Sequence, residues 1–247
     1  MKRNSIFFVI LLFSCVSVAS EIKVLPENIS FDLKNINNHY LVIHNTDKYK
    51  EPPPLLIFLH GAGERGTDIS KLKTGAGIPP TRFFDKEKNQ PFLILAPQCL
   101  PNTWWDVDEL NLWFDHISKT EKFDKKRIYL TGLSMGGFGT FKWVANNEPR
   151  FAAAASICGG WERKNFKSKP SSHELENLLS VPLWVFHGDK DKVVPSWQSK
   201  NMVNLAMANG SNKIKFTLFE SLGHAIWEEV YVNNNQLYEW LLQHKSK

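Results

Sequence analysis

The sequence predicts an α/β protein built on a mostly parallel sheet of about eight strands, with helices on both faces and no large lid. Two observations carry this prediction. Apolar runs of strand length alternate along the chain with longer segments whose apolar residues recur at helical spacing, a pattern typical of parallel sheets covered on both sides. The chain has 247 residues, 43% of them apolar, which is enough for one large domain with its own core.

The strands are expected where apolar runs are bounded by turn residues. An early pair around residues 22–44, which includes Tyr40–His44, should form antiparallel edge strands, joined to the rest of the sheet through Pro52-Pro53-Pro54. The remaining predicted strands are Leu55–His60, Phe92–Pro97, Arg127–Thr131, Ala153–Cys158, Leu183–His187 and Lys215–Glu220.

Amphipathic segments between these strands predict the helices. Their apolar residues lie on one helical stripe, and they span Asp106–Thr120, Ser134–Asn147, Ser196–Ala208 and Trp227–His244. Open α/β sheets bind ligands at the carboxyl ends of their strands. The loops that follow the strands are therefore where functional residues are expected.

The first twenty residues are predicted to be a secretory signal peptide, followed by a single domain over residues 21–247. Lys2 and Arg3 precede a short apolar run and then small residues, with cleavage expected after Ala19 or Ser20. An alternative is Leu12-Phe13-Ser14-Cys15, which resembles the lipobox of bacterial lipoproteins, although Phe13 departs from the usual small residue. We therefore expect a secreted or periplasmic protein, or a lipoprotein anchored through Cys15. No later segment is long enough to span a membrane.

Charge and cysteine content argue against two classes of protein. The net charge of +5 falls to +3 without Lys2 and Arg3, and the other lysines are scattered, so no nucleic-acid partner is predicted. Three cysteines are too few for a disulfide scaffold or a four-ligand zinc site. Cys99 and Cys158 end two different predicted strands, and we expect both to be free and largely buried.

Gly132-Leu133-Ser134-Met135-Gly136 directly follows a predicted strand and opens a predicted helix. This is the G-x-S-x-G nucleophile elbow in the strand–turn–helix context that it requires. The sharp turn leaves no room for side chains beside the serine, and the helix N-terminus favours a developing negative charge. Ser134 is therefore the candidate nucleophile.

A serine hydroxyl needs a base, and the base needs an orienting carboxylate. Two later strand-end loops supply them in the chain order that this motif predicts, Ser, Asp, His. His224 lies in the loop after the last strand and is the candidate base. Asp189 and Asp191 compete as the acid; Asp191 is favoured because it lies further out in its loop. His60 and His187, which end strands, are interpreted as structural residues.

An oxyanion hole needs two backbone N–H donors. Met135, directly after the nucleophile, should provide one. The glycine-rich loop His60–Gly66 should provide the other, with Ala62 the first candidate and Gly63 the second. Glu64 and Arg65 in this loop either contribute to specificity or form an internal ion pair that stiffens it.

The same loop fits the dinucleotide pattern G-x-G-x-x-G. A dinucleotide fold would next require a helix and a strand that ends in an acidic residue, whereas here the next strand ends in Ala96-Pro97-Gln98. The sequence also lacks the phosphate-binding pattern G-x-x-x-x-G-K-[ST] and any zinc-like spacing of His and Glu. No cofactor and no metal are predicted.

With these residues assembled, the chain resembles the α/β-hydrolases. More narrowly, it is similar to small secreted esterases related to feruloyl and acetyl-xylan esterases, to dienelactone hydrolases and to predicted peptidases of the prolyl-oligopeptidase type. The matching segments are Leu59–Gly66, Ala96–Gln98, Gly132–Gly137, His187–Pro195 and Gly223-His224.

The resemblance implies a catalytic triad of Ser134, Asp191 and His224 and oxyanion donors at Ala62 and Met135. It also implies a strand order in which two strands separate those ending at Cys99 and Cys158. The chain departs from prolyl oligopeptidases in lacking their propeller, which weakens the peptidase interpretation.

The chain has nine tryptophans, a high number for its length. Five of them lie in loops beyond the strand ends: Trp104, Trp105, Trp161, Trp197 and Trp227. Aromatic rings there either bind sugar or phenolic groups or pack in the core. Trp105, Trp161 and Trp227 are the candidate substrate-binding residues.

These observations predict a secreted serine esterase that cleaves carbohydrate-linked or phenolic esters through an acyl-enzyme. Its partner would be a small-molecule or polysaccharide-linked ester. The alternatives are a serine peptidase of the prolyl-oligopeptidase type, a phospholipase or lipase, and a non-catalytic carbohydrate-binding module with a degenerate hydrolase fold.

The two interpretations of the N-terminus predict different masses for the exported protein. We expect a mature chain that begins at Ser20 or Glu21, because the small residues before these positions fit signal peptidase cleavage. Intact-mass spectrometry after expression in a bacterial host with its own leader measures this directly. A chain that begins at Cys15 and carries acyl groups would instead establish the lipoprotein.

Overall fold

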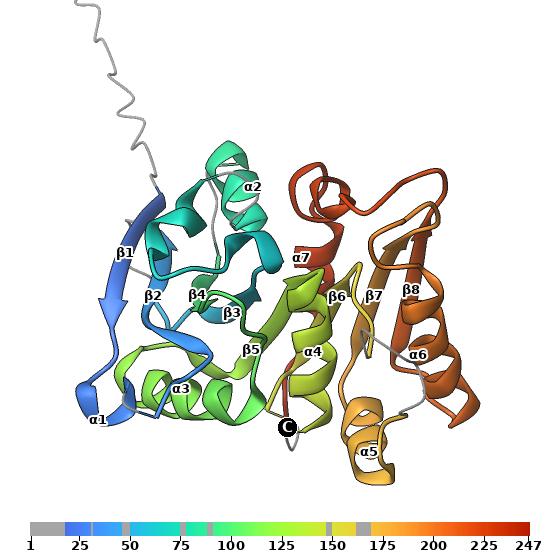
Figure 1. The fold of residues 1–247 in the computed structure, drawn as a ribbon, viewed down its shortest axis with the longest axis horizontal. Coiled ribbons are helices and arrows are strands. Elements are labelled where there is room, and N and C mark those ends of the chain that lie inside the picture. The colour runs from blue at the N-terminus through green and yellow to red at the C-terminus, as the bar shows by residue number, and fades with distance from the viewer. Residues whose placement is uncertain are drawn as a thin grey trace, which may run out of the picture.

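The computed structural model describes residues 18–30, 32–45, 50–74, 78–87, 91–146, 150–161 and 169–247. These residues form an eight-stranded sheet that twists from β1 at one end to β8 at the other, with helices on both faces (Figure 1). The strands are β1 (Val18–Val24), β2 (Ile36–Asn45), β3 (Pro54–Leu59), β4 (Leu93–Cys99), β5 (Asp124–Leu133), β6 (Ala153–Ile157), β7 (Leu183–Gly188) and β8 (Ile214–Phe219). The longer helices are α2 (Pro79–Glu87), α3 (Val107–Thr120), α4 (Met135–Ala145), α5 (Ser172–Ser180), α6 (Trp197–Ala208) and α7 (Gln236–Leu242). The shorter turns are α1 (Glu27–Ser30), η1 (Ala62–Glu64), η2 (Ile69–Lys73) and η3 (Glu228–Val232).

The strand order is β1-β2-β4-β3-β5-β6-β7-β8. The first two strands pair antiparallel with each other and β2 pairs antiparallel with β4, whereas all later pairs are parallel. The predicted antiparallel edge pair and mostly parallel sheet are confirmed. Cys99 ends β4 and Cys158 follows β6, with β3 and β5 between them, and both thiols are free and buried as predicted.

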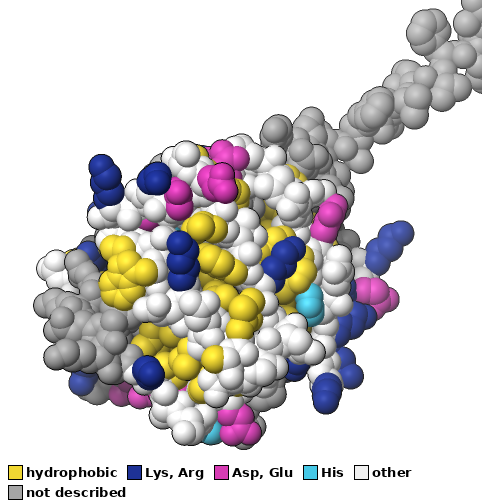
Figure 2. Space-filling model, turned by 90° about the vertical axis from the view of Figure 1, so that its right-hand side faces the viewer, with side chains coloured by type: hydrophobic (Ala, Val, Ile, Leu, Met, Phe, Trp, Pro, Cys, Tyr) yellow, Lys and Arg dark blue, Asp and Glu magenta, His cyan; other side chains and the backbone are white. Residues whose placement is uncertain are grey.

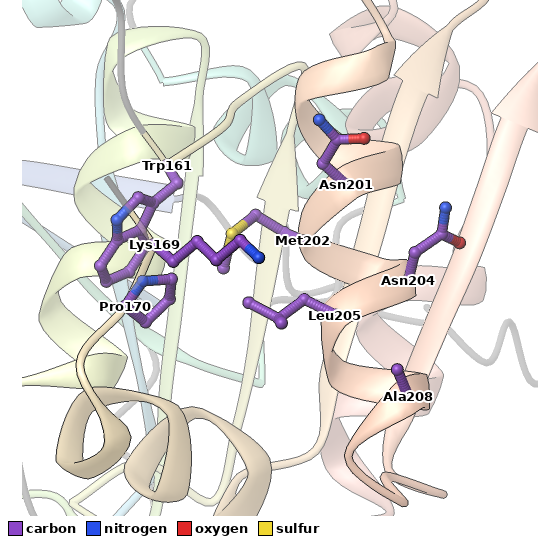
Figure 3. A pocket seen from close by; sticks show the side chains of 8 residues that line it. All are labelled: Trp161, Lys169, Pro170, Asn201, Met202, Asn204, Leu205 and Ala208. Atoms are coloured by element: carbon purple, nitrogen blue, oxygen red, sulfur yellow. The ribbon is translucent and has the colours of Figure 1, made fainter. Parts of the chain in front are cut away.

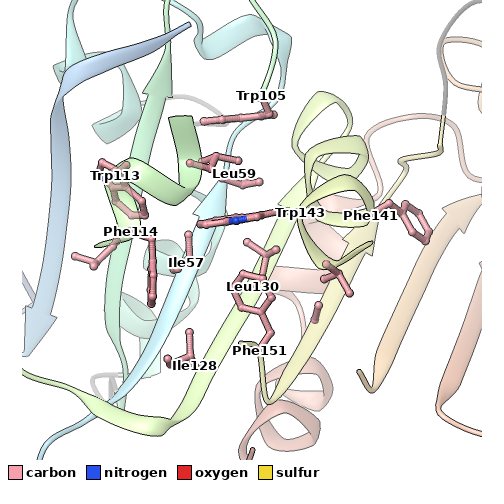
Figure 4. Packing of buried hydrophobic residues seen from close by; sticks show 14 of the residues in the cluster. Ile57, Leu59, Trp105, Trp113, Phe114, Ile128, Leu130, Phe141, Trp143 and Phe151 are labelled. Atoms are coloured by element: carbon pink, nitrogen blue, oxygen red, sulfur yellow. The ribbon is translucent and has the colours of Figure 1, made fainter. Parts of the chain in front are cut away.

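Two apolar layers cover the sheet. On one face, Trp113 and Phe114 of α3 and Trp143 of α4 pack onto Ile57 and Leu130 of the central strands (Figure 4). On the other face, side chains of α2, η3 and α7 pack against the opposite side of the same strands. Every residue of β3 is buried, as expected for a strand covered on both sides.

The C-terminal segment differs from the single helix predicted over Trp227–His244. It forms the π-helical turn η3 and then α7, interrupted by Asn233-Asn234-Asn235. The side-chain amides of Asn233 and Asn234 donate to groups of Glu229, and the Asn235 amide donates to Glu239. The Asn234 side chain binds the backbone on both sides of the break, since its amide donates to the Glu229 carbonyl and its Oδ1 accepts from the Gln236 N–H, and this competes with a continuous helix.

Two helices were not predicted. α2 begins with Pro79 and Pro80, residues that are tolerated only in the first turn. α5 begins with a capping box, in which the Ser171 hydroxyl accepts from the Glu174 N–H at 3.2 Å and the Glu174 carboxylate accepts from the Ser171 N–H at 2.8 Å.

Residues 1–17, which include Lys2, Arg3 and Cys15, lie outside the described residues. The last positions of the predicted signal peptide, Val18–Ser20, are the first residues of β1 and pair with Ile43–Asn45 of β2. Among the helices of the described residues, none has both the length and the apolar character needed to cross a bilayer.

The opposite edge of the sheet is formed by β8. Seen from this side, apolar side chains are exposed among lysines and arginines (Figure 2). Unlike the central strands, β8 has no fully buried residue.

The turn between β5 and α4 depends on a close backbone approach at Gly136. A Cβ atom placed there would lie 1.9 Å from the carbonyl oxygen of Leu59 and 2.9 Å from that of His60. Both obstacles are backbone atoms, so neither can move aside without displacing β3 or the loop after it. Glycine is therefore required for the nucleophile turn to pack against β3.

We expect Gly136→Ala to lower the free energy of unfolding by at least about 2 kcal/mol, because the added methyl group would overlap the backbone of β3. The matched control is Gly63→Ala, where an added Cβ meets no atom within 4 Å, and its effect should stay below about 0.5 kcal/mol. Urea denaturation of both variants measures the difference. Equal stability of the two would contradict the packing argument.

Candidate active site

Ser134 lies at the tight turn between β5 and α4. Its φ is +52° and its ψ is −116°, in a region that residues with a side chain rarely occupy. The fold holds this conformation, since the Ser134 N–H donates to the Ile157 carbonyl at 2.8 Å and the Phe138 N–H donates to the Ser134 carbonyl at 3.1 Å. Strain of this kind costs of order 1–3 kcal/mol and persists only where the surrounding structure imposes it.

His224, in the loop after β8, joins Ser134 to Asp191. Its Nε2 lies 2.9 Å from the Ser134 Oγ, and its Nδ1 lies 2.7 Å from the Asp191 Oδ2. Because Nδ1 faces a carboxylate, it carries the proton, which leaves Nε2 free to accept the serine hydroxyl hydrogen. The structure thus brings together three residues that the sequence separates by 90 and 33 positions.

The Asp191 carboxylate is buried and accepts hydrogen bonds on both oxygens. Oδ1 accepts from the backbone N–H groups of Val193 and Val194 at 2.8 and 2.9 Å. Oδ2 accepts from His224 and, at 3.1 Å, from the His187 Nε2. Burial by itself would raise the pKa of Asp191, but the hydrogen bonds outweigh it and hold that pKa well below the usual range. Asp191 is therefore ionised at neutral pH and can stabilise a protonated imidazole.

Asp189, the competing acid, makes different contacts. Its N–H donates to the Phe219 carbonyl at 3.0 Å, and its Oδ2 lies 3.3 Å from the Lys190 Nζ. Its Oδ1 is buried and has no hydrogen-bond partner among the described residues. Asp191 rather than Asp189 therefore reaches His224.

The candidate oxyanion donors lie at the starts of two elements that follow neighbouring strands. Ala62 begins η1 after β3, and Met135 begins α4 after β5. The register of the sheet pairs Leu59 with Gly132, so each donor lies three positions beyond the same pair. Neither backbone N–H donates to another group within the described part of the chain.

Of the two roles considered for Glu64 and Arg65, the internal ion pair is not formed among the described residues. The Arg65 guanidinium donates to two carbonyl oxygens, that of Ala62 at 3.0 Å and that of Thr103 at 3.1 Å, and so ties the loop to the segment after β4. Burial raises the pKa of Glu64, although backbone N–H groups of Glu64 and Gly61 partly oppose the shift.

His60 is a structural residue, as interpreted from the sequence. Its Nδ1 donates to the Gly61 carbonyl at 2.5 Å, and its Nε2 accepts from the Cys99 N–H at 2.9 Å. Burial lowers the pKa of His60 to about 4, so the ring is neutral at neutral pH and both of its nitrogens are used.

The three candidate substrate-binding tryptophans are placed differently. Trp105 is buried, its indole N–H donates to the His60 carbonyl at 3.2 Å, and its ring lies where a side chain at Gly139 would be. It packs in the core, and its role as a substrate contact stays a prediction. Trp227 is half-buried and meets the His224 ring edge-on, with centroids 5.8 Å apart.

Trp161 is buried at one end of a cavity of about 340 Å³. The cavity lies between the segment around Pro170 and the side of α6 that carries Met202 and Leu205, which point toward Trp161 (Figure 3). None of Ser134, Asp191 and His224 lines this cavity. Among the described residues, no three His, Cys, Asp or Glu side chains are grouped so as to hold a metal ion.

Comparison with known proteins places the chain among esterase-like hydrolases. The sequence profile of the dienelactone hydrolase family matches residues 102–236, a range that contains Ser134, Asp191 and His224. The Bacillus subtilis (strain 168) protein named "Putative esterase YitV" is 27% identical, over 58% of this chain and 70% of that protein. The crystal structure of a thermostable esterase is 30% identical with a TM-score of 0.73; it matches 93% of this chain, which spans 63% of that protein's length.

A ferulic acid esterase structure is 16% identical with a TM-score of 0.64, covering 92% of this chain and 96% of that chain. At this level of identity the likeness shows the fold alone. The matches confirm the predicted α/β-hydrolase fold and family resemblance, and they support a hydrolase of the esterase type.

Exchanging each aspartate for asparagine distinguishes the two candidate acids. Asp191→Asn should slow the labelling of Ser134 by a fluorophosphonate probe about 10³-fold or more, because an amide cannot stabilise the imidazolium. Asp189→Asn should label within a few-fold of the unmodified protein, since Asp189 makes no contact with His224 among the described residues. Rapid-quench labelling followed by mass spectrometry gives both rates. Equal losses in the two variants would refute the assignment of Asp191.

Proposed function

The chain belongs to the dienelactone hydrolase family, and from that premise we propose that it is a serine hydrolase that cleaves carboxylic esters through an acyl-enzyme. The observation that carries the proposal is the unbroken line of hydrogen bonds from the Ser134 Oγ through His224 to Asp191. A hydroxyl that donates to a neutral imidazole, held in turn by an ionised carboxylate, is an activated nucleophile.

In the first half of the reaction, the Ser134 Oγ attacks the ester carbonyl carbon and its proton moves to the His224 Nε2. The carbonyl oxygen becomes an oxyanion, stabilised by the N–H groups of Ala62 and Met135. Asp191 stabilises the imidazolium across the 2.7 Å contact. The C–O bond to the alcohol then breaks, and the His224 Nε2 returns its proton to the leaving oxygen.

In the second half, water takes the place of the alcohol. His224 accepts a proton from the water as its oxygen attacks the acyl carbon, and the same N–H groups hold the second oxyanion. The bond to the Ser134 Oγ breaks, the serine recovers its proton from His224, and the carboxylic acid is released.

We propose that the ester carries a phenolic or carbohydrate-linked group. Trp227 beside His224 supports this class of substrate, because aromatic rings stack on sugar and phenolic rings. Val193 and Trp197 both follow Asp191 in the chain. They are 70% and 44% exposed and add apolar surface beside the acid loop. Export from the cytoplasm is part of the same proposal and is supported by the charged and apolar pattern of the first twenty residues.

Ser134→Ala should reduce ester turnover at least about 10⁴-fold while leaving the thermal midpoint nearly unchanged, because only the nucleophile is removed. The matched control is Ser118→Ala on the exposed side of α3, which should retain full activity. The assay uses a panel of methyl ferulate, acetylated xylan, short aryl esters and peptides. Residual turnover by Ser134→Ala above background would refute the serine mechanism, and hydrolysis confined to the peptides would replace the esterase with a peptidase.

A further inference from the structure

A second histidine contacts the Asp191 carboxylate from inside the protein. His187 lies at the end of β7 and is fully buried. Its Nε2 is 3.1 Å from the Asp191 Oδ2, the same oxygen that binds His224, and 2.8 Å from the Val194 carbonyl. Because both of these groups are acceptors, Nε2 must carry a proton.

The other nitrogen of His187 is tied to a different part of the fold. Nδ1 lies 2.7 Å from the hydroxyl of Ser199 on α6, and that hydroxyl lies 2.9 Å from the Gly159 carbonyl in the loop after β6. Ser199 is fully buried and has a single hydrogen to share between these two neighbours.

This chain of contacts leads back to the nucleophile turn. Gly159 packs against the first turn of α4, where a Cβ added to it would lie 2.5 Å from the carbonyl carbon of Gly137. The Ser156 hydroxyl donates to the Gly137 carbonyl at 3.0 Å from the same side. The acid loop and the nucleophile turn are thus joined through buried groups as well as through His224.

We propose that His187 is a positioning residue, which holds the Asp191 carboxylate in line with His224 and limits how strongly that carboxylate attracts the proton of His224. The proposal rests on the function proposed above. His187 does not contact Ser134 in the described structure and acts only through Asp191. Because Oδ2 shares its negative charge between two histidines, loss of one donor strengthens its interaction with the other.

Few other titratable groups face His187. Asp191 lies in the loop after its own strand, and His224 from the loop after β8 lies on the far side of that carboxylate. The groups facing it from α6 and from the loop after β6 are the neutral Ser199 hydroxyl and the Gly159 carbonyl. Cys158 also lies near Asp191, and burial raises the pKa of its thiol so that it stays protonated.

Two amide substitutions of His187 separate a positioning role from packing. In His187→Gln the side-chain amide can reach the place of Nε2 and keep a donor for Asp191. In His187→Asn the amide is one methylene shorter and lies near the place of Nδ1, so Asp191 loses this donor. Both variants are polar and uncharged and differ in volume by one methylene group, so their thermal midpoints are measured beside the kinetics.

For His187→Asn we expect kcat to fall about tenfold, with KM within about twofold, because a carboxylate freed from one donor draws His224 out of line with Ser134 while the substrate surface is intact. The midpoint of the acid limb of kcat/KM should move to higher pH by about half a unit or more, because Asp191 then favours the protonated form of His224. His187→Gln should recover kcat to within about threefold and restore the midpoint. Equal kinetics and equal pH profiles for the two variants would overturn the proposal.

Ser199→Ala keeps the test decisive if His187→Asn does not fold. It leaves the Asp191 contact in place but removes the anchor of His187, and kcat should fall about threefold with KM unchanged. An unchanged kcat would contradict the role of the network. The rate at which a fluorophosphonate labels Ser134, measured on all variants, separates this proposal from the previous one. If the unmodified protein does not label, the serine hydrolase is overturned. If it labels normally and the His187 variants keep its kinetics and pH profile, only the positioning role is overturned.

Discussion

The arrangement of the loops that follow β7 and β8 depends on the buried carboxylate of Asp191. An ionised group removed from water is costly unless every acceptor site meets a donor, and here four donors converge on two oxygens. They come from the acid loop, from the end of β7 and from the loop after β8. The need to satisfy one charge therefore fixes the positions of three segments relative to one another. The alignment of His224 with Ser134 is one consequence of that arrangement.

The nucleophile turn is held by a different kind of interaction, the close contact of backbone with backbone. Ser134 occupies a strained conformation that no local preference of serine would choose. It is kept there because Gly132 and Gly136 allow the turn to lie against β3 and because its N–H is bonded to β6. Stability and reactivity are linked at this point, since a side chain at either glycine would push the turn away from β3 and displace the serine oxygen from His224.

Much of this architecture could be predicted because periodicity and motif order report on it directly. The core strands, the elbow around Ser134 and the loop position of His224 all follow from patterns read along the chain. α5 was missed even though Ser171 and Glu174 form a readable capping box, because the apolar stripe that follows is short. The Glu64–Arg65 ion pair does not form because Arg65 binds carbonyl oxygens instead. One of them belongs to Thr103, 38 positions away, and two neighbouring opposite charges in a sequence do not reveal such a distant partner. Trp105 and His187 show the same limit: a residue at a strand end or in the loop beyond it can point into a site or into the core, and only tertiary packing decides.

What brings the site together is the register of the parallel sheet. Leu59 pairs with Gly132, so Ala62 and Met135, each three residues further on, leave the sheet side by side. Gly188 pairs with Phe219, and Asp191 and His224 follow three and five residues later. Shifting either pairing by one residue would turn the side chains of the strand to the opposite face and would offset the loops that follow the two strands. The apolar layers that stabilise the sheet therefore also set the spacing of the four segments that carry the groups proposed for the reaction, and the hydrogen bonds of Asp191 complete their alignment.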